Sequence, residues 1–232
     1  MSLAILTPFE GKAWALSEWT RGLGRIRLPE GTRFIWFCNA ESNDFWTRLQ
    51  VEAVALPYAV SLWCDATKII GTPHAKDRTV SRLWRELRRR VPADTDRILC
   101  LEDDVLMGDD TVGRLLTLSK CYGEANVIGA PVPCRIPGSD GVYGAWFHRG
   151  GRFVDAPAQP IPAPVDSISF GCTLFPRSLF DGLTLASAND ALSDQAWGYD
   201  RCAGEEVRAM GAQMIAAWGV PVEHLQHPEG DA

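Results

Sequence analysis

Two hydrophobic patterns alternate along the first half of the chain. Short apolar runs, typical of buried strands, are separated by segments in which apolar residues recur at helical spacing. Strands that alternate with helices predict a mostly parallel sheet flanked by helices, whose ligands lie beyond the carboxyl ends of the strands. The expected strands are LAILTP, RFIWFCNA, YAVSLWCD and RILCL. The expected helices are KAWALSEWTRGL, DFWTRLQVEAVA and AKDRTVSRLWRELRRRV, the last with Val80, Leu83, Trp84, Leu87 and Val91 at helical spacing.

The second half of the chain has a different pattern. A helix is expected at DDTVGRLLTLSK and a strand at NVIGAPV, after which Pro and Gly become frequent between Val132 and Asp166. This composition indicates a hairpin and a long irregular loop. Strand structure returns at SISFGCTLFP, followed by helices at RSLFDGL and AWGYDRCAGEEVRAMG. Because no linker separates the halves, we expect one domain over residues 1–232, with two functional lobes at 1–104 and 105–232.

Composition and charge narrow the classes of function. The 232 residues are 46% hydrophobic and 22% charged, and a net charge of -6 with a pI of about 5.3 argues against a broadly basic nucleic-acid-binding surface. No apolar run approaches the ~18–20 residues of a transmembrane helix, and no signal peptide or stable membrane insertion is expected. The seven cysteines are scattered without a CxxC pair, which disfavours a disulfide framework and fits a cytoplasmic protein.

The stretch RILCLEDDVLMGDD carries the most specific chemistry. A buried-strand pattern runs directly into Glu102, Asp103 and Asp104, and carboxylates this close repel one another unless a cation joins them. Acids that follow a buried strand at a ligand-facing edge commonly hold Mg²⁺ or Mn²⁺ on a phosphate substrate. In an extended segment, Glu102 and Asp104 would point to one side and Asp103 to the other. Alternatively, these acids cap the helix that begins near Asp109 or are simply solvated.

Two segments near the C-terminus contain further candidates. In VEHLQHP, His224 or His227 can complete a metal site begun by a carboxylate, although either can also be an ordinary surface or core histidine. In WGYDRCAGEEVRAMG, Asp200 lies near the start of a helix with Trp197 close by. There Asp200 can act as a base, or it can simply interact with the helix macrodipole.

Basic and aromatic residues elsewhere in the chain are further candidates for contacts with a ligand. Lys76 and Arg78 begin a helix, and cations beside free N–H groups suit a diphosphate. Trp146 and Trp197 lie in the loop-rich half and are the tryptophans that we expect near a sugar. A solvated helix face is expected for Arg82, Arg85, Arg88, Arg89 and Arg90.

In this order, the motifs resemble those of GT-A glycosyltransferases, particularly glycosyltransferase family 2. In that family a nucleotide-binding half ends in an acidic DxD motif, and LEDDV has the form E-x-D, with Glu102 first and Asp104 last. SISFGCTLFPRSLFDGL is similar to the family's glycine-containing strand and helix, and it includes Gly171. GYDRCAGEEVRAMG resembles the family's G-E-D-x-D helix, and VEHLQH resembles its terminal histidine segment. The chain departs from the family where Tyr199 replaces an acid and Cys202 replaces an Asp.

The resemblance implies a GT-A, Rossmann-like fold and an inverting, metal-dependent hexosyltransferase that moves a sugar from a UDP- or GDP-sugar to an acceptor hydroxyl. Residues 1–104 would bind the nucleotide sugar, and residues 105–232 the acceptor. Asp104 and His224 would hold Mn²⁺ or Mg²⁺, with histidine favouring Mn²⁺, and Asp200 would be the base. Phe9 is a further candidate for contact with the nucleobase or ribose. Donor-binding residues would be Pro8, Glu10, Asn39, Glu41, Lys76, Arg78, Glu102, Asp103, Gly171 and Trp197.

Two other classes of function are open at the level of sequence. A nucleotidyltransferase or another Mg²⁺-dependent phosphoryl-transfer enzyme also places acids after strands, but it usually needs a second carboxylate pair. A non-catalytic carbohydrate- or nucleotide-sugar-binding protein on a degenerate transferase fold would account for Tyr199 and Cys202. The acceptor can be a glycan, a lipid-linked sugar, a protein, a small molecule or a modified nucleobase.

Overall fold

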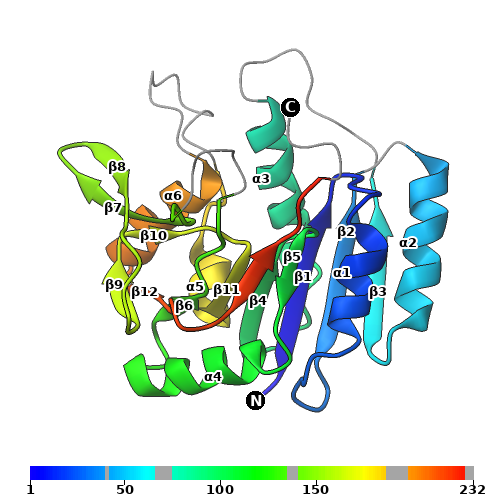
Figure 1. Cartoon of the computed structure of the whole chain (residues 1–232), viewed down its shortest axis with the longest axis horizontal. Coiled ribbons are helices and arrows are strands. Elements are labelled where there is room, and N and C mark those ends of the chain that lie inside the picture. Colours follow the sequence, from blue (N-terminus) through cyan, green and yellow to red (C-terminus); the bar gives the residue numbers. More distant parts are fainter. Residues whose placement is uncertain (40–41, 66–74, 135–140, 187–197, 228–232) are drawn as a thin grey trace.

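The structure is a computed structural model that describes residues 1–39, 42–65, 75–134, 141–186 and 198–227. In its first half, strands and helices alternate as the sequence predicts (Figure 1). These elements are β1 (Leu3–Phe9), α1 (Leu16–Leu23), β2 (Arg33–Cys38), α2 (Asn43–Ala55), β3 (Ala59–Cys64), α3 (Ala75–Arg88) and β4 (Arg97–Leu101).

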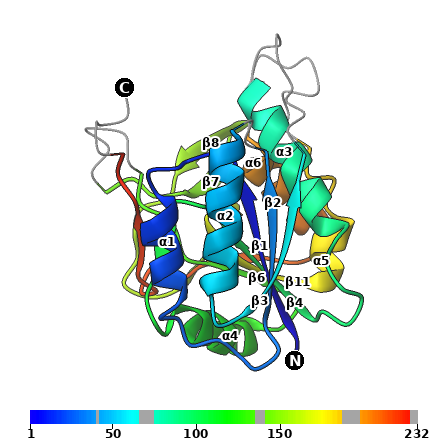
Figure 2. The ribbon, with the colours of Figure 1, turned by 90° about the vertical axis from the view of Figure 1, so that its right-hand side faces the viewer.

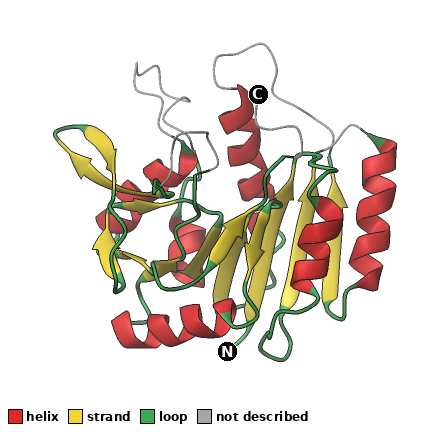
Figure 3. Cartoon of the chain, viewed as in Figure 1, coloured by secondary structure: helices red, strands yellow, loops and turns green. Residues whose placement is uncertain are grey.

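The second half contains shorter strands and three helices among its described residues (Figure 3). Its first elements are β5 (Val105–Met107), α4 (Thr111–Tyr122), β6 (Val127–Gly129), β7 (Ala145–Arg149), β8 (Arg152–Asp155) and β9 (Ala163–Val165). Those that follow are β10 (Ser167–Ile168), β11 (Cys172–Pro176), α5 (Arg177–Gly182), α6 (Tyr199–Ala209), β12 (Met214–Ala216) and β13 (Val222–His224).

Both halves contribute to one eight-stranded sheet, with the strand order β3-β2-β1-β4-β11-β6-β12-β9. Strands β1 to β4 are mutually parallel, and β6 and β12 run in the same direction, whereas β11 and β9 are antiparallel to their neighbours. Helices α1 and α2 cover one face and α3 covers the other (Figure 2). The predicted α/β fold with a mostly parallel sheet flanked by helices is confirmed.

Helices on both faces explain why the first strands are apolar throughout. In β1, Leu3 and Ile5 pack in the core that contains α1 and α2, whereas Ala4 and Leu6 pack on the side of α3. A strand that is buried on both faces reads as a continuous apolar run rather than as an alternating one. The apolar residues of α3 recur at helical spacing because they form the face that packs on the sheet, where Leu83, Trp84 and Leu87 are fully buried.

One prediction is wrong, since the arginines of α3 and of the residues just after it do not form a uniformly solvated face. The Arg90 guanidinium lies 4.6 Å from the Phe37 ring centroid and 4.9 Å from that of Trp63. Arg88 Nη1 donates to the carbonyl oxygen of Phe180 over 3.4 Å. Long arginine stems therefore cover apolar surface here while their charged ends find local acceptors.

The Pro- and Gly-rich segment forms the predicted hairpin, β7–β8, which joins β10 in a three-stranded sheet. A second small sheet pairs β13 with β5, which begins four residues after β4 ends. This pairing brings the C-terminal segment to the carboxyl end of β4. No helix in the described ranges is both long and apolar enough to cross a membrane.

Candidate functional site

The acid cluster lies where the fold predicts a ligand, directly after β4. Glu102 N donates to the Gly171 carbonyl oxygen over 3.1 Å, and the indole Nε1 of Trp19 donates to the Glu102 carbonyl oxygen over 3.0 Å. A turn follows, in which Val105 N donates to the Glu102 carbonyl oxygen over 3.2 Å. The backbone of Gly171 and Val105 and the side chain of Trp19 therefore fix the position of the acids.

This turn corrects the expected orientation of the three acids, which assumed an extended segment. Asp103 does not point away from Asp104, because the ammonium of Lys12 joins the two: Nζ lies 2.7 Å from Asp103 Oδ1 and 2.8 Å from Asp104 Oδ2. Both carboxylates are buried, which excludes the solvated interpretation. They do not cap α4 either, because Asp110 occupies the N-cap position of that helix.

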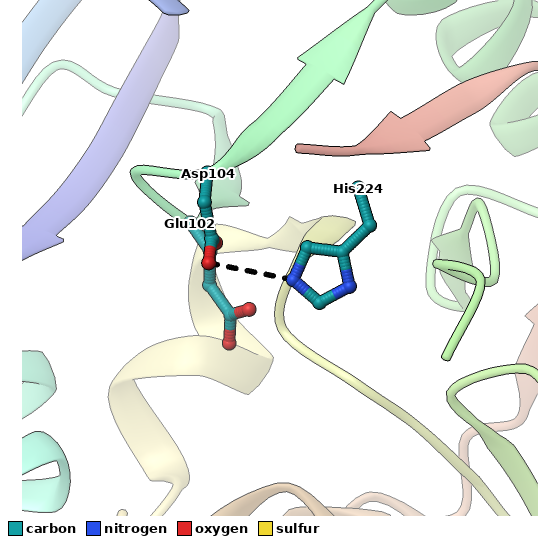
Figure 4. Close-up of side chains that lie close together, drawn as sticks. All are labelled: Glu102, Asp104 and His224. Atoms are coloured by element: carbon teal, nitrogen blue, oxygen red, sulfur yellow. Dashed lines mark ion pairs between the residues drawn. The ribbon is translucent and has the colours of Figure 1, made fainter. Parts of the chain in front are cut away.

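His224 reaches the cluster through the pairing of β13 with β5, in which it lies opposite Val105. Leu225 N donates to the Asp104 carbonyl oxygen over 2.8 Å, and His224 Nε2 lies 3.4 Å from Asp104 Oδ2 (Figure 4). His224 Nδ1 lies 2.9 Å from the carbonyl oxygen of Pro133. Since a carbonyl can only accept, Nδ1 carries the proton, and in neutral imidazole Nε2 keeps its lone pair.

These side chains fit a divalent ion. One donor atom each from Glu102, Asp104 and His224 lies within 4.8 Å of the other two. A histidine that donates its second N–H to a backbone carbonyl has its ring orientation fixed, as is usual for metal-ligating histidines. Two carboxylates and an imidazole are a suitable ligand set for Mn²⁺, whereas Mg²⁺ prefers oxygen ligands alone. His227 lies elsewhere, with its ring centroid 5.2 Å from that of Trp14.

Burial and neighbouring charges shift the pKa values of the three acids in different directions. Burial raises the pKa of Glu102, and the charges of Asp104 and Asp200 add to this effect. Burial also raises the pKa of Asp103 to about 6, although Lys12 opposes it. For Asp104, burial is outweighed by the contacts with His224 and with the Lys12 ammonium, which hold its pKa below the usual range. Asp104 is therefore the acid most firmly kept as a carboxylate.

Asp200 lies in the first turn of α6, close to the acid cluster. Its Oδ1 accepts a hydrogen bond from Arg201 N over 2.8 Å, and its carbonyl oxygen accepts one from Ser167 Oγ over 2.8 Å. This position agrees with an acid at a helix start. The negative charge of Asp200 also raises the pKa of Glu102, whereas its role as a base stays a prediction. Trp146 lies nearby, opposite Ser167 in the strand pairing, with the Arg201 guanidinium 4.6 Å from its ring centroid.

The predicted nucleobase or ribose contacts are only partly supported by their positions. Phe9 is a core residue, 1% exposed, whose ring packs against Trp19 and Trp36, so this prediction is wrong. Pro8 is also buried within β1, whereas Glu10 follows the end of that strand and is half-buried. The prediction for Pro8 is therefore not favoured by its burial.

At the ends of β2 and β3, the expected donor-binding residue Asn39 is part of a partly buried polar network. Arg82 of α3 donates to Asp65 Oδ2 over 2.8 Å and to Asn39 Oδ1 over 3.1 Å. Arg82 is thus a further exception to the predicted solvated face. Arg78 is half-buried one turn earlier in the helix. Glu41, Trp197 and the side chain of Lys76 lie outside the described residues.

Gly171 contacts the acid cluster through its backbone. Its carbonyl oxygen accepts from Glu102 N, as described above, and a Cβ at this position would lie 2.6 Å from Val132 Cγ2. Glycine is therefore required by close packing against Val132. This geometry gives Gly171 a part in positioning the acids, whereas its predicted contact with a donor stays a prediction.

Sequence reasoning missed Lys12, Arg82 and the role of Tyr199. A signal for Lys12 was available, because Gly11–Lys12 follows the first strand and three adjacent acids need a cation. Arg82 could have been found by asking which residue of the helix approaches Asn39. The Tyr199 hydroxyl, which lies 3.2 Å from Glu102 Oε1, had no signal in the sequence.

Solved glycosyltransferase structures share this fold. The mannosyltransferase PcManGT from Pyrobaculum calidifontis, in complex with GDP-Man and Mn²⁺, gives a TM-score of 0.65 at 14% identity over 98% of this chain and 58% of that one. S. aureus TarS gives 0.62 at 10% identity over 99% and 37%, and TarS 1–349 with UDP-GlcNAc gives 0.57 at 9% identity over 98% and 59%.

The chain therefore has a GT-A-like glycosyltransferase fold, as its resemblance implied. It spans less than two thirds of the length of these structures. The sequence matches no protein-family model and no curated protein at a significant level.

Proposed function

We propose that this chain is a metal-dependent glycosyltransferase that moves a sugar from a nucleotide-diphosphate sugar to an acceptor hydroxyl with inversion. The observation that carries the proposal is the group formed by Glu102, Asp104 and His224 at the carboxyl end of β4. In a parallel α/β sheet, that edge is where ligands bind. The GT-A-like fold supports the same interpretation.

Asp104 and His224 would hold the ion, and Glu102 would bind the ribose or a metal-bound water. A divalent ion at this place neutralises the diphosphate that leaves when the anomeric carbon is attacked. A solved structure with a similar fold, PcManGT, contains Mn²⁺ and GDP-Man, which supports Mn²⁺ as the ion. We therefore propose Mn²⁺ before Mg²⁺, because histidine is a poor ligand for Mg²⁺.

The donor would lie along the ends of β1 to β4. Asn39, Asp65 and Arg82 form a fixed polar surface at the ends of β2 and β3, which suits the nucleobase or ribose. The start of α3, with Lys76 and Arg78, suits the diphosphate because helix N-termini and cations bind anions. The solved neighbours bind GDP-Man or UDP-GlcNAc, so we propose a UDP- or GDP-sugar as the donor.

Asp200 would accept the proton of the acceptor hydroxyl. It lies at the start of α6, and the hydrogen bond from Ser167 to its carbonyl oxygen ties this turn to β10. The negative charge of Asp200 raises the pKa of Glu102, so the two carboxylates interact electrostatically. A base fixed on a rigid helix end keeps its orientation toward the reacting hydroxyl.

The test is a panel of nucleotide sugars, measured by thermal shift with and without Mn²⁺. A bound donor stabilises the native state by mass action, so one donor should raise the melting temperature only when Mn²⁺ is present. That donor is then incubated with candidate acceptors while nucleoside diphosphate and pyrophosphate are measured. Release of nucleoside diphosphate supports glycosyl transfer, whereas release of pyrophosphate indicates a nucleotidyltransferase. Binding without either product, across many acceptors, indicates a non-catalytic sugar-nucleotide-binding protein.

A further inference from the structure

Lys12 makes close contacts with the acid cluster from the loop between β1 and α1. Gly11, with a φ of 93°, turns the chain just before Lys12. The ammonium then reaches two carboxylates at once, 2.7 Å from Asp103 and 2.8 Å from Asp104. The Lys12 side chain is 22% exposed, whereas the two carboxylate side chains are 4% and 1% exposed. Lys12 is therefore the partner of this ion-pair cluster that is more accessible to solvent.

The ammonium and the proposed metal site share one oxygen atom. Asp104 Oδ2 is the atom that both Lys12 Nζ and His224 Nε2 approach, at 2.8 and 3.4 Å. A divalent ion bound to this oxygen and to His224 Nε2 would share Asp104 Oδ2 with the positive charge of Lys12. Like charges at such separations repel strongly where water is largely excluded. Binding of the ion and contact between Lys12 and Asp104 therefore oppose each other.

Asp103 provides a second attachment that does not involve the metal-ligating oxygen. Its Oδ1 contacts Lys12 independently, and its buried Oδ2 has no hydrogen-bond partner among the described residues. Lys12 can thus leave Asp104 and still be held at the site by Asp103. The charges of the cluster also allow a divalent ion to bind. The carboxylates of Glu102, Asp103 and Asp104 outnumber the single ammonium of Lys12, and a divalent ion can balance the excess negative charge.

We propose that Lys12 is an exchangeable counter-cation of the donor site. It occupies Asp104 when the donor is absent, stays bound to Asp103 when a divalent ion takes its place, and then pairs with the donor's diphosphate. This inference rests on the proposed function, since it assumes the metal and diphosphate at Asp104. Two consequences follow: Lys12 weakens the binding of the ion alone, and it makes the ion and a nucleoside diphosphate bind cooperatively.

The experiment measures binding of Mn²⁺ by calorimetry, with and without UDP or GDP. The variants are Lys12→Met, which removes the charge, Lys12→Arg, which keeps it, and Lys120→Met as the matched control on the exposed surface of α4. Without nucleotide, Lys12→Met should bind Mn²⁺ at least about tenfold more tightly than the parent. The factor by which the nucleotide tightens Mn²⁺ binding should shrink by a similar amount. Lys12→Arg and Lys120→Met should bind Mn²⁺ like the parent.

Equal or weaker binding of Mn²⁺ by Lys12→Met overturns the inference. A lysine that only stabilises the fold would leave Mn²⁺ binding unchanged, and one that helps to bind the ion would make the variant bind more weakly. An unchanged coupling between Mn²⁺ and nucleotide overturns it as well. If Lys12→Met unfolds because its buried acids lack a partner, added Mn²⁺ should restore the melting transition, and failure to do so counts against the exchange. The proposed function fails separately, and takes the inference with it, if the parent binds no Mn²⁺ with any nucleotide.

Discussion

The phenolic hydroxyl of Tyr199 lies 3.2 Å from Glu102 Oε1 and donates a hydrogen bond to it, although 97 residues separate them. The ring of Tyr199 is buried, with centroids 5.3 Å from Phe170 and 6.4 Å from Trp84. Burial and the adjacent Glu102 charge raise the pKa of the tyrosine well above its ordinary value, so it stays a donor at neutral pH. Tyr199 stands where the motif that the sequence resembles has an acid, and its hydroxyl donates to the carboxylate of Glu102.

Tyr199→Phe should therefore weaken metal binding while the fold is retained. The change deletes one hydrogen bond and keeps the ring packing, so the unfolding free energy should fall by about 1 kcal/mol. The hydroxyl acts through Glu102, which we place on the ribose or on metal-bound water, so its loss should weaken Mn²⁺ binding by at most roughly 10-fold. Urea unfolding and calorimetry measure the two effects. Mn²⁺ affinity equal to that of the parent would show that the hydroxyl does not position Glu102 for the ion.

Asp104 should be the acid on which metal binding depends most. Asp104→Asn removes the carboxylate that Lys12 and His224 both approach, so Mn²⁺ binding should weaken by more than roughly 100-fold. The fold should persist, since Lys12 keeps its contact with Asp103. Glu102→Gln should have a milder effect on the ion, because we place Glu102 on the ribose or on metal-bound water. Calorimetry with Mn²⁺ compares the two variants, and a larger loss in Glu102→Gln would reverse the assignment.

The two C-terminal histidines provide a matched pair. His224→Ala should weaken Mn²⁺ binding and the metal dependence of donor binding, because it removes the imidazole that faces Asp104. His227→Ala should change neither, because that ring packs against Trp14. Thermal shift with donor and Mn²⁺ detects both effects. Equal responses of the two variants would remove histidine from the proposed site.

Much of the fold could be predicted because it depends on local pattern. A buried strand such as β1 is apolar throughout since helices cover both faces, and the buried side of α3 repeats at Leu83, Trp84 and Leu87. The end of β4 could be predicted as a candidate ligand site because three acids follow an apolar run there. Pairing of His224 with Asp104 was reached only through the family resemblance, since no local rule joins residues 120 positions apart.

The remaining contacts depend on tertiary structure that spacing does not encode. Lys12 meets Asp103 and Asp104 only because β1 and β4 are neighbours in the sheet. Phe9 was expected to contact the nucleobase or ribose through the family resemblance, but its place in the strand buries it against Trp19. Alternation of side chains also failed for Asp103, because the segment after β4 forms a turn and is not extended.

Glu86 of α3 should give a measurable pH dependence that is independent of the site. Its hydrogen bond from Arg90, over 2.7 Å, lowers its pKa, while burial opposes this. A lowered folded-state pKa stabilises the protein above the ordinary value of 4.5, and this contribution disappears as the pH falls through the lowered pKa. Glu86→Gln should thus lose about 0.5–1 kcal/mol at pH 7 and less at pH 3. Urea unfolding at both pH values tests this, with Glu18→Gln on the exposed face of α1 as the control.

Asp200 is the residue through which the chemical step can be tested separately from binding. Asp200→Asn keeps the size of the side chain and can still accept the hydrogen bond from Arg201 N, so α6 should remain intact. It cannot accept the proton of an attacking hydroxyl, so turnover should fall by roughly 10²–10⁴-fold. Donor affinity should stay nearly unchanged, because the ion and diphosphate are assigned to other residues.

The same reaction also reports the stereochemistry of transfer. A base that activates an acceptor for direct attack on the anomeric carbon gives a product whose configuration is opposite to that of the donor. NMR of the parent's product should show this inversion, while initial rates and donor titration compare Asp200→Asn with the parent. Glu205→Gln is the matched control, because Glu205 lies further along α6 and pairs with His148 and Arg208. Near-parental turnover in Asp200→Asn would leave Asp200 as a helix-start acid, and a retained configuration would exclude direct displacement.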